Sequence, residues 1–152
     1  MPAPAVESDQ DLATRLAVEA GQLLVQTRAQ LFAQGLNHWS VKNAGDDAAQ
    51  TFLMNELRSR RPDDAVLSEE GREDTRRFDG GRVWIIDPLD GTREFAERDR
   101  VDWAVHIALW EDDHFVAGAV SLPALDQVFA MDPPPTMPDI VRARPILITS
   151  RN

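Results

Sequence analysis

Two aspartates, Asp87 and Asp90, follow the apolar run 83–86 almost directly. The residues of that run are β-branched or aromatic with no polar position among them, which predicts a strand buried on both faces. Pro88 favours an extended backbone at Asp87, so we expect a sharp turn across which the two carboxylates converge. Carboxylates this close repel each other unless a cation lies between them. With neither Cys nor His nearby, oxygen ligands favour Mg²⁺ over Zn²⁺.

Gly91 and Thr92 extend this stretch toward an anion site. Gly91 allows the backbone to approach a ligand closely, and Thr92 offers a hydroxyl where a short helix could begin with free N–H groups. Asp-Pro and Asp-Gly are also ordinary turn dipeptides, so a plain strand-to-turn transition is the alternative. A second acidic pair, Glu69 and Glu70, follows another short apolar run and favours a metal-binding site over a plain turn.

Composition narrows the class of protein. A chain of 152 residues with 43% apolar residues is long enough for one folded domain with a real core. The absence of cysteine excludes disulfides, thiolate metal sites and a cysteine nucleophile. A net charge of −10 argues against binding a nucleic acid polymer. No run is long enough to span a membrane and no signal peptide pattern is present, so we expect no integral membrane segment and a cytoplasmic location.

The spacing of apolar residues predicts two long helices and a sheet. The first helix runs over about 9–33, and after a loop over 35–45 a second begins at Asp46 or Asp47, where capping alone would explain an aspartate. Strands are expected at 65–68, 83–86, 103–110, 115–121, 125–131 and 144–149, with a hairpin turn at 111–114. This order predicts an α+β fold in which two long helices pack on one face of a mostly antiparallel sheet.

None of the three histidines belongs to a recognisable catalytic or metal-binding motif in the sequence. His106 lies in the expected strand 103–110 between Val105 and Ile107, and we interpret it as a core histidine rather than a ligand. His38 and His114 fall in expected loops.

Two acidic motifs resemble those of a known enzyme family. Ser68-Glu69-Glu70-Gly71, followed by the run Trp-Ile-Ile-Asp-Pro-Leu-Asp-Gly-Thr over 84–92, resembles the inositol monophosphatase superfamily of Mg²⁺-dependent phosphatases. The resemblance covers the chain from the first expected helix onward. Arg93-Glu94-Phe95 after the motif is similar to the 3′(2′),5′-bisphosphate nucleotidase branch, which acts on 3′-phosphoadenosine 5′-phosphate.

The resemblance implies a site with two or three Mg²⁺ ions. Glu69, Asp87 and the Leu89 carbonyl would hold one ion, and Asp87 with Asp90 would reach a second. Asp46 would orient Thr92 to take a proton from a metal-bound water, with Glu70 supporting the catalytic group from behind the ligands. The residues implied to contact the substrate are Glu69, Asp90, Gly91, Thr92 and Arg93.

Two departures from the family pattern qualify these assignments. Members have a Thr where this chain has Asn43, which leaves Asp47 as a competitor of Asp46. Members also carry a second domain with a Trp-Asp motif that completes the metal site, and no tryptophan here is followed by Asp. The chain therefore resembles the N-terminal portion, with a flexible lead-in at 1–8, a metal-binding domain at 9–149 and the start of the next domain at 150–152.

The expected function is a Mg²⁺-dependent phosphomonoesterase that removes the 3′-phosphate of a small nucleotide, 3′-phosphoadenosine 5′-phosphate, by two-metal activation of water. This chain alone would be weak or inactive. The alternatives are an inositol-1-monophosphatase-type sugar phosphatase, a fructose bisphosphate phosphatase, or a non-catalytic remnant that binds metal or nucleotide. Exposed sheet surface would favour a homodimer or association with a complementary C-terminal domain.

Overall fold

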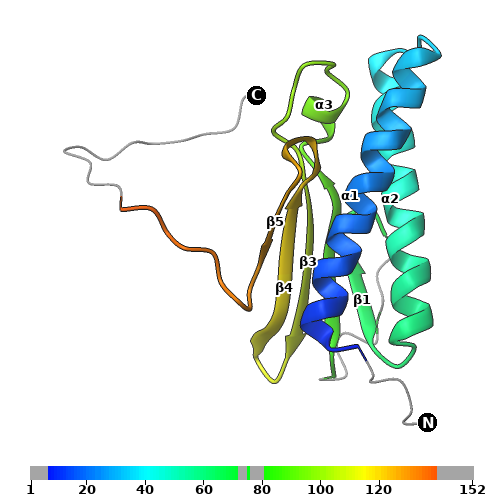
Figure 1. The fold of residues 1–152 in the computed structure, drawn as a ribbon. Coiled ribbons are helices and arrows are strands. Elements are labelled where there is room, and N and C mark those ends of the chain that lie inside the picture. The colour runs from blue at the N-terminus through cyan, green and yellow to red at the C-terminus, as the bar shows by residue number, and fades with distance from the viewer. Residues whose placement is uncertain (1–6, 72–74, 76–80, 140–152) are drawn as a thin grey trace, which may run out of the picture.

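The computed structural model describes residues 7–71, 75 and 81–139. Helices α1 (Asp9–Ala33) and α2 (His38–Arg60) lie side by side against one face of a sheet (Figure 1). The five strands of the described residues are β1 (Ala65–Ser68), β2 (Val83–Asp90), β3 (Ala104–Glu111), β4 (His114–Leu122) and β5 (Gln127–Ala130), hydrogen-bonded in that order. The β1–β2 pair is parallel and the three other pairs are antiparallel, which confirms the predicted α+β class.

Hydrophobic burial between the helices and the sheet holds these two layers together. Leu12 and Leu16 of α1 and Leu53 and Leu57 of α2 are fully buried, as is Trp84 of β2. Burying side chains of this size contributes about 1.5–3 kcal/mol each, so the interface between the layers is the main source of stability. Neither long helix is apolar enough to span a bilayer, nor is any other helix of the described residues.

A charged cluster closes the end of this core where α1 begins. The indole N–H of Trp84 donates to Asp64 at 2.8 Å, and the same carboxylate accepts from Arg82 at 3.1 Å. Arg82 also binds Asp9 at the start of α1 (2.7 Å) and Glu111 at the end of β3 (3.0 Å). One guanidinium thus joins the first helix to the sheet at the end opposite the acidic motifs.

The start of α2 differs from the sequence-based prediction. Asn37 caps the helix, its Oδ1 accepting from the Ser40 N–H at 2.9 Å. The expected loop over 35–45 is therefore correct only for 35–37, and residues 38–45 are helical. Asp46 consequently lies well inside α2 and is not its cap. Gly45 is the last residue of the expected loop, and a Cβ there would lie 2.5 Å from Cε1 of Phe95. The glycine allows close packing and does not end the helix.

The hairpin turn and the strands that follow agree with the predicted pattern. Asp112 and Asp113 have φ values of 49° and 61°, as a two-residue turn between antiparallel strands requires. The expected strand 125–131 is shorter, because residues 123–125 form a 3-10 helix before β5. The expected strand 144–149, the boundary at 150 and most of the lead-in 1–8 lie outside the described residues.

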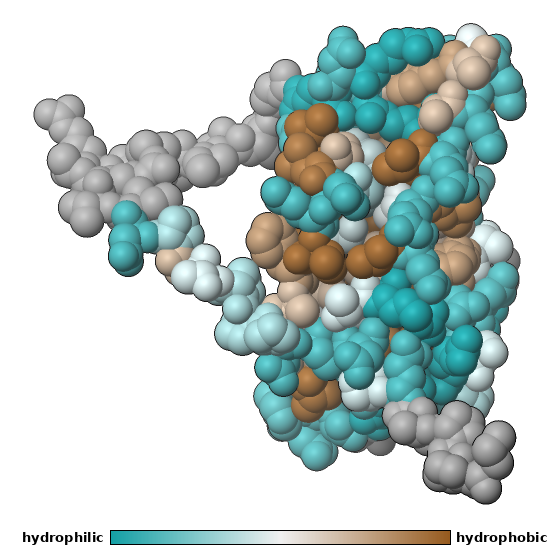
Figure 2. Space-filling model, in the orientation of Figure 1, coloured by the Kyte–Doolittle hydropathy of each residue, from teal (hydrophilic) through white to brown (hydrophobic). Residues whose placement is uncertain are grey.

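The sheet face that carries no described helix is partly open. Val83, Trp84 and Ile86 are buried, but Ile85 is half-buried and points to that open face, so the prediction of burial on both sides of the strand is wrong there. Figure 2 shows, on the side that carries α1 and β5, apolar residues in separate patches among hydrophilic ones. Apolar residues scattered in this way are normal for a protein surface.

Replacing Gly45 with Ala is expected to destabilise the protein. Inside a helix this change ordinarily stabilises by up to about 1 kcal/mol. Here the new methyl would overlap the Phe95 ring and crowd Leu89, so we expect a loss of about 1–3 kcal/mol. Thermal or urea unfolding would measure it. Gly81→Ala, where a Cβ meets nothing within 4 Å, is the control and should change stability little. A Gly45→Ala protein as stable as the control would contradict the packing role.

Candidate metal and phosphate site

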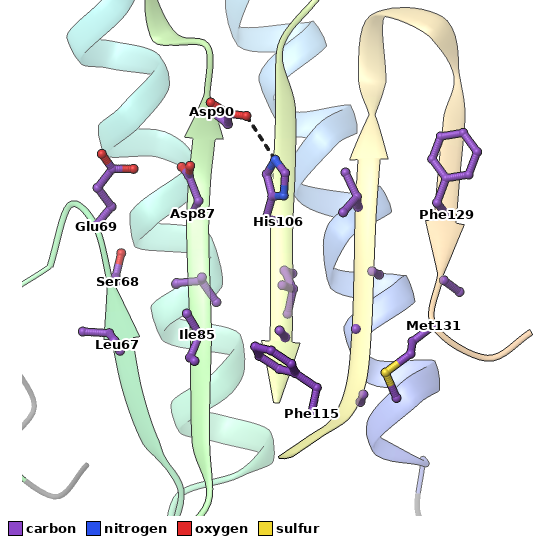
Figure 3. A pocket seen from close by; sticks show the side chains of 18 of the residues that line it. Leu67, Ser68, Glu69, Ile85, Asp87, Asp90, His106, Phe115, Phe129 and Met131 are labelled. Atoms are coloured by element: carbon purple, nitrogen blue, oxygen red, sulfur yellow. Dashed lines mark hydrogen bonds and ion pairs between the residues drawn. The ribbon is translucent and has the colours of Figure 1, made fainter. Parts of the chain in front are cut away.

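A bulge in β2 aligns the two aspartates of the central motif. Asp87 pairs with His106 and Asp90 pairs with Ala104, so three steps along β2 match two along β3. Side chains three residues apart in a regular strand point to opposite faces. The extra residue restores the alternation, and both carboxylates lie on the open face (Figure 3). The expected sharp turn after Asp87 is therefore wrong, because β2 continues to Asp90.

Glu69 reaches the same end of the sheet from the neighbouring strand. β1 runs parallel to β2 and ends at Ser68, whose hydroxyl donates to Gln50 of α2 at 2.6 Å. Figure 3 shows Glu69, Asp87 and Asp90 in a row at this end of the open face. In the part of the chain that the structure describes, no three acidic or histidine side chains form a ready-made metal cluster. The three predicted ligands thus lie side by side, and their carboxylates do not converge on one point.

The electrostatics of Asp87 show how strongly this row concentrates negative charge. Burial and the charges of Glu69 and Asp90 raise the pKa of Asp87 to about 6. The nearby His106 and the Leu89 N–H, which donates to Asp87 at 3.2 Å, oppose the rise but do not cancel it. A carboxylate whose charge is this poorly compensated fits a site that binds a divalent cation.

Asp46 approaches from α2 and is the more suitable of the two candidate aspartates. Its side chain is buried, whereas Asp47 is exposed. Burial and the charge of Glu70 raise the pKa of Asp46 to about 6, against the opposing effects of Lys42 and the Thr92 hydroxyl. The Oδ1 atom of Asp46 has no hydrogen-bond partner among the described residues. A buried oxygen without a donor is costly and indicates room for one more interaction.

The short helix α3 (Thr92–Phe95) begins where the sequence predicts it. Gly91 precedes it with φ 79°, and a Cβ there would lie 2.9 Å from the Asp102 carbonyl, so a glycine is required. The Thr92 hydroxyl donates to the Leu89 carbonyl at 3.1 Å. That carbonyl is a predicted metal ligand and retains a second lone pair. Arg93 is exposed on α3.

Arg28 of α1 anchors the loop that follows α3. Its guanidinium donates to the carbonyls of Phe95 (2.7 Å), Arg98 (3.2 Å) and Arg100 (3.1 Å), as well as that of Glu97. It also lies over the rings of Phe95 and two other aromatic residues, Phe32 and Trp103. These contacts fix the position of α3 relative to the helical layer. The sequence analysis missed this role, because the carbonyls that Arg28 binds are far away in sequence.

His106 is the second residue that the sequence analysis missed. Its imidazole is 43% exposed on the open face, and Nε2 lies 3.2 Å from Oδ2 of Asp90. The prediction of a core histidine is therefore wrong. The alternation of β3 contained the signal, since Val105 and Ile107 are buried against the helices and His106 between them must point the other way.

A shallow hollow of about 920 Å³ extends from the acidic row along the open face. Its floor is mostly apolar and includes Leu67, Ile85, Phe115, Phe129 and Met131 (Figure 3). The acidic groups and His106 line one end of it. The face thus combines a charged end, where a metal ion and a phosphate could bind, with an apolar remainder.

Comparison with known proteins agrees with the fold and the motifs. The sequence profile of the inositol monophosphatase family matches residues 6–132. The chain belongs to the inositol monophosphatase family. Within this family, the 3′-phosphoadenosine 5′-phosphate phosphatase of Mycobacterium leprae is 52% identical over 105 residues, which are 68% of this chain and 38% of that protein. The 3′(2′),5′-bisphosphate nucleotidase CysQ of Escherichia coli is 39% identical over 94 residues, which are 60% of this chain and 37% of that protein.

The solved structure of an inositol monophosphatase II from Staphylococcus aureus shares the fold. It aligns with a TM-score of 0.67 and 27% sequence identity, over 78% of this chain and 42% of that one. The chain spans about two fifths of the length of the curated relatives that it matches.

Replacing Asp46 with Asn is expected to stabilise the metal-free protein at neutral pH. Because its folded-state pKa is raised to about 6, the folded protein binds more protons than the unfolded one between about pH 4 and pH 6. Stability is therefore lost as the pH rises through this window. We expect Asp46→Asn to remove that loss and to stabilise by about 1–2 kcal/mol at pH 8, the full shift being reduced by solvent screening.

Thermal melts in EDTA at pH 4.5 and pH 8 would test this expectation. The gain in stability from Asp46→Asn should be larger at pH 8 than at pH 4.5. Asp113→Asn, the same chemical change at an exposed residue of the distant hairpin turn, is the control and should melt in parallel with the unmodified protein. A gain that does not depend on pH would contradict the proposed cause.

Proposed function

We propose that the complete protein is a Mg²⁺-dependent phosphatase that removes the 3′-phosphate of 3′-phosphoadenosine 5′-phosphate. The observation that carries the proposal is the row of carboxylates Glu69, Asp87 and Asp90, in which the negative charge of Asp87 is poorly compensated. The names of the M. leprae and E. coli relatives support this nucleotide as the substrate.

The donor set of the row suits Mg²⁺. The site offers oxygen ligands, and the raised pKa of Asp87 reports negative charge that a cation would neutralise. Glu69, Asp87 and the Leu89 carbonyl would hold one ion, and Asp87 with Asp90 a second. When bound, such a pair of ions lowers the pKa of water and neutralises the charge of the transferred phosphate.

The other residues of the site position the substrate and move a proton. Asp46, whose pKa is raised to about 6, can accept a proton near neutral pH. Its Oδ1 is buried and unpartnered among the described residues, and the Thr92 hydroxyl, which here donates to the Leu89 carbonyl, would turn to donate to it and could then receive a proton in turn. The negative charge of Glu70 helps to keep the pKa of Asp46 raised. The N–H groups of Gly91 and Thr92 would bind the phosphate, and Arg93 is an exposed cation beside them.

The substrate and the assembly of the whole protein stay open to test. Since the chain spans about two fifths of its relatives, further chain would supply part of the substrate contacts. An inositol phosphate is the second candidate substrate, because the S. aureus structure of the same fold is an inositol monophosphatase. A cytoplasmic location and a homodimer, both expected from the sequence, stay predictions.

Asp87→Asn is expected to abolish phosphate release by the complete protein with Mg²⁺. The change removes a negative charge that both ions would share. Since replacing a residue that only hydrogen-bonds a metal ligand lowers metal affinity or activity by up to about 100-fold, we expect the loss of a ligand to lower kcat/KM by more than about 100-fold. Release of inorganic phosphate from 3′-phosphoadenosine 5′-phosphate and from inositol 1-phosphate, with and without EDTA, would measure it.

Asp113→Asn is the control for this experiment. It makes the same chemical change in the hairpin turn at the far end of the sheet, where φ is 61° and Asn is well tolerated. Its activity should equal that of the unmodified protein. Full activity of Asp87→Asn, or activity that EDTA does not reduce, would refute the metal-dependent mechanism. Preference for inositol 1-phosphate would replace the proposed substrate with the second candidate.

A further inference from the structure

The contact between His106 and Asp90 is the part of the acidic row that the proposed function does not use. Nε2 of the imidazole lies 3.2 Å from Oδ2 of the carboxylate, and the pair stands on the open face at the charged end of the hollow (Figure 3). Resting on the proposed function, we propose that His106 is a positioning residue that holds the Asp90 carboxylate in the orientation in which it binds the metal ion.

Asp90 needs such a support because of its position. It is the last residue of β2, beyond the bulge, and its side chain is 60% exposed. An exposed aspartate at a strand end would rotate freely, and fixing it on metal binding would cost conformational entropy. A carboxylate offers two oxygens, so a donor that holds Oδ2 leaves Oδ1 available to the ion.

The backbone holds His106 in the place where it can act. It is the register partner of Asp87 on β3, and Val120 of β4 is its partner on the other side. Neighbours on both sides restrict the imidazole, and the bulge brings Asp90 next to it. The hydrogen bond thus links a side chain on a central strand to one at the exposed end of the neighbouring strand.

The chemistry of histidine suits this role better than that of a permanent cation. A neutral imidazole donates one N–H without adding charge, whereas Lys or Arg at this position would compete with the metal ion for the carboxylates. Residues that hydrogen-bond metal-binding carboxylates in this way commonly improve metal affinity by 10–100-fold.

Two variants of similar length separate the donor from the bulk of the side chain. His106→Gln places an N–H near the position of Nε2, and His106→Met removes the donor. With the full chain at pH 8, Mg²⁺ titration calorimetry and Mn²⁺ binding followed by electron paramagnetic resonance would give the dissociation constants. We expect His106→Met to weaken metal binding by about 10–100-fold and His106→Gln to recover most of it. Equal melting temperatures in EDTA would verify that both variants fold.

The same change in an Asp90→Ala background tests whether His106 acts through Asp90. There, His106→Met should cause no further loss of affinity. Unchanged or tighter binding by His106→Met, or an equal loss in His106→Gln, would overturn the positioning role. Asp87→Asn distinguishes a failure of the positioning role from a failure of the proposed function. If Asp87→Asn abolishes binding while His106→Met does not weaken it, the positioning role alone fails; if Asp87→Asn binds Mg²⁺ normally, the metal site itself fails.

Discussion

The bulge in β2 is the constraint on which the acidic site depends. Asp87 and Asp90 are three residues apart, and a regular strand would place one of them in the core beneath the helices. Pro88, which has no backbone N–H, lies between them where the pairing with β3 is interrupted. The extra residue turns both carboxylates to the open face, and His106 lies opposite. Without the bulge the row of ligands would not exist.

The alignment of like charges has an energetic cost that the fold must support. Asp46 and Asp87 both have a pKa raised to about 6, because each is partly removed from water and faces another carboxylate. These groups destabilise the metal-free protein above that pH and would be relieved by cations. The site is thus arranged for a ligand rather than for the stability of the empty fold, as is common at functional sites.

The rest of the domain gives the stability and rigidity that this arrangement requires. Leucine side chains of both helices pack on the sheet, and the Arg82 cluster joins the start of α1 to the sheet at the far end. Near the site, Gly45 lets α2 lie directly against the Phe95 ring, and Arg28 binds the loop after it. These contacts hold the segment after β2, on which Gly91 and Thr92 lie, against the helical layer.

The sequence alone determined the fold class, the end of β1 that precedes Glu69 and the short helix at Thr92, since these follow from apolar periodicity and local turn chemistry. It ended β2 too early, because Asp-Pro resembles a turn when the pairing with β3 is not known. It misplaced the start of α2, because Gly45 resembles a helix break unless its contact with Phe95 is known. It also missed His106, Arg28 and the common direction of Asp87 and Asp90. Each of these depends on the pairing of strands or on contacts between distant segments, and only the tertiary structure brings those partners together.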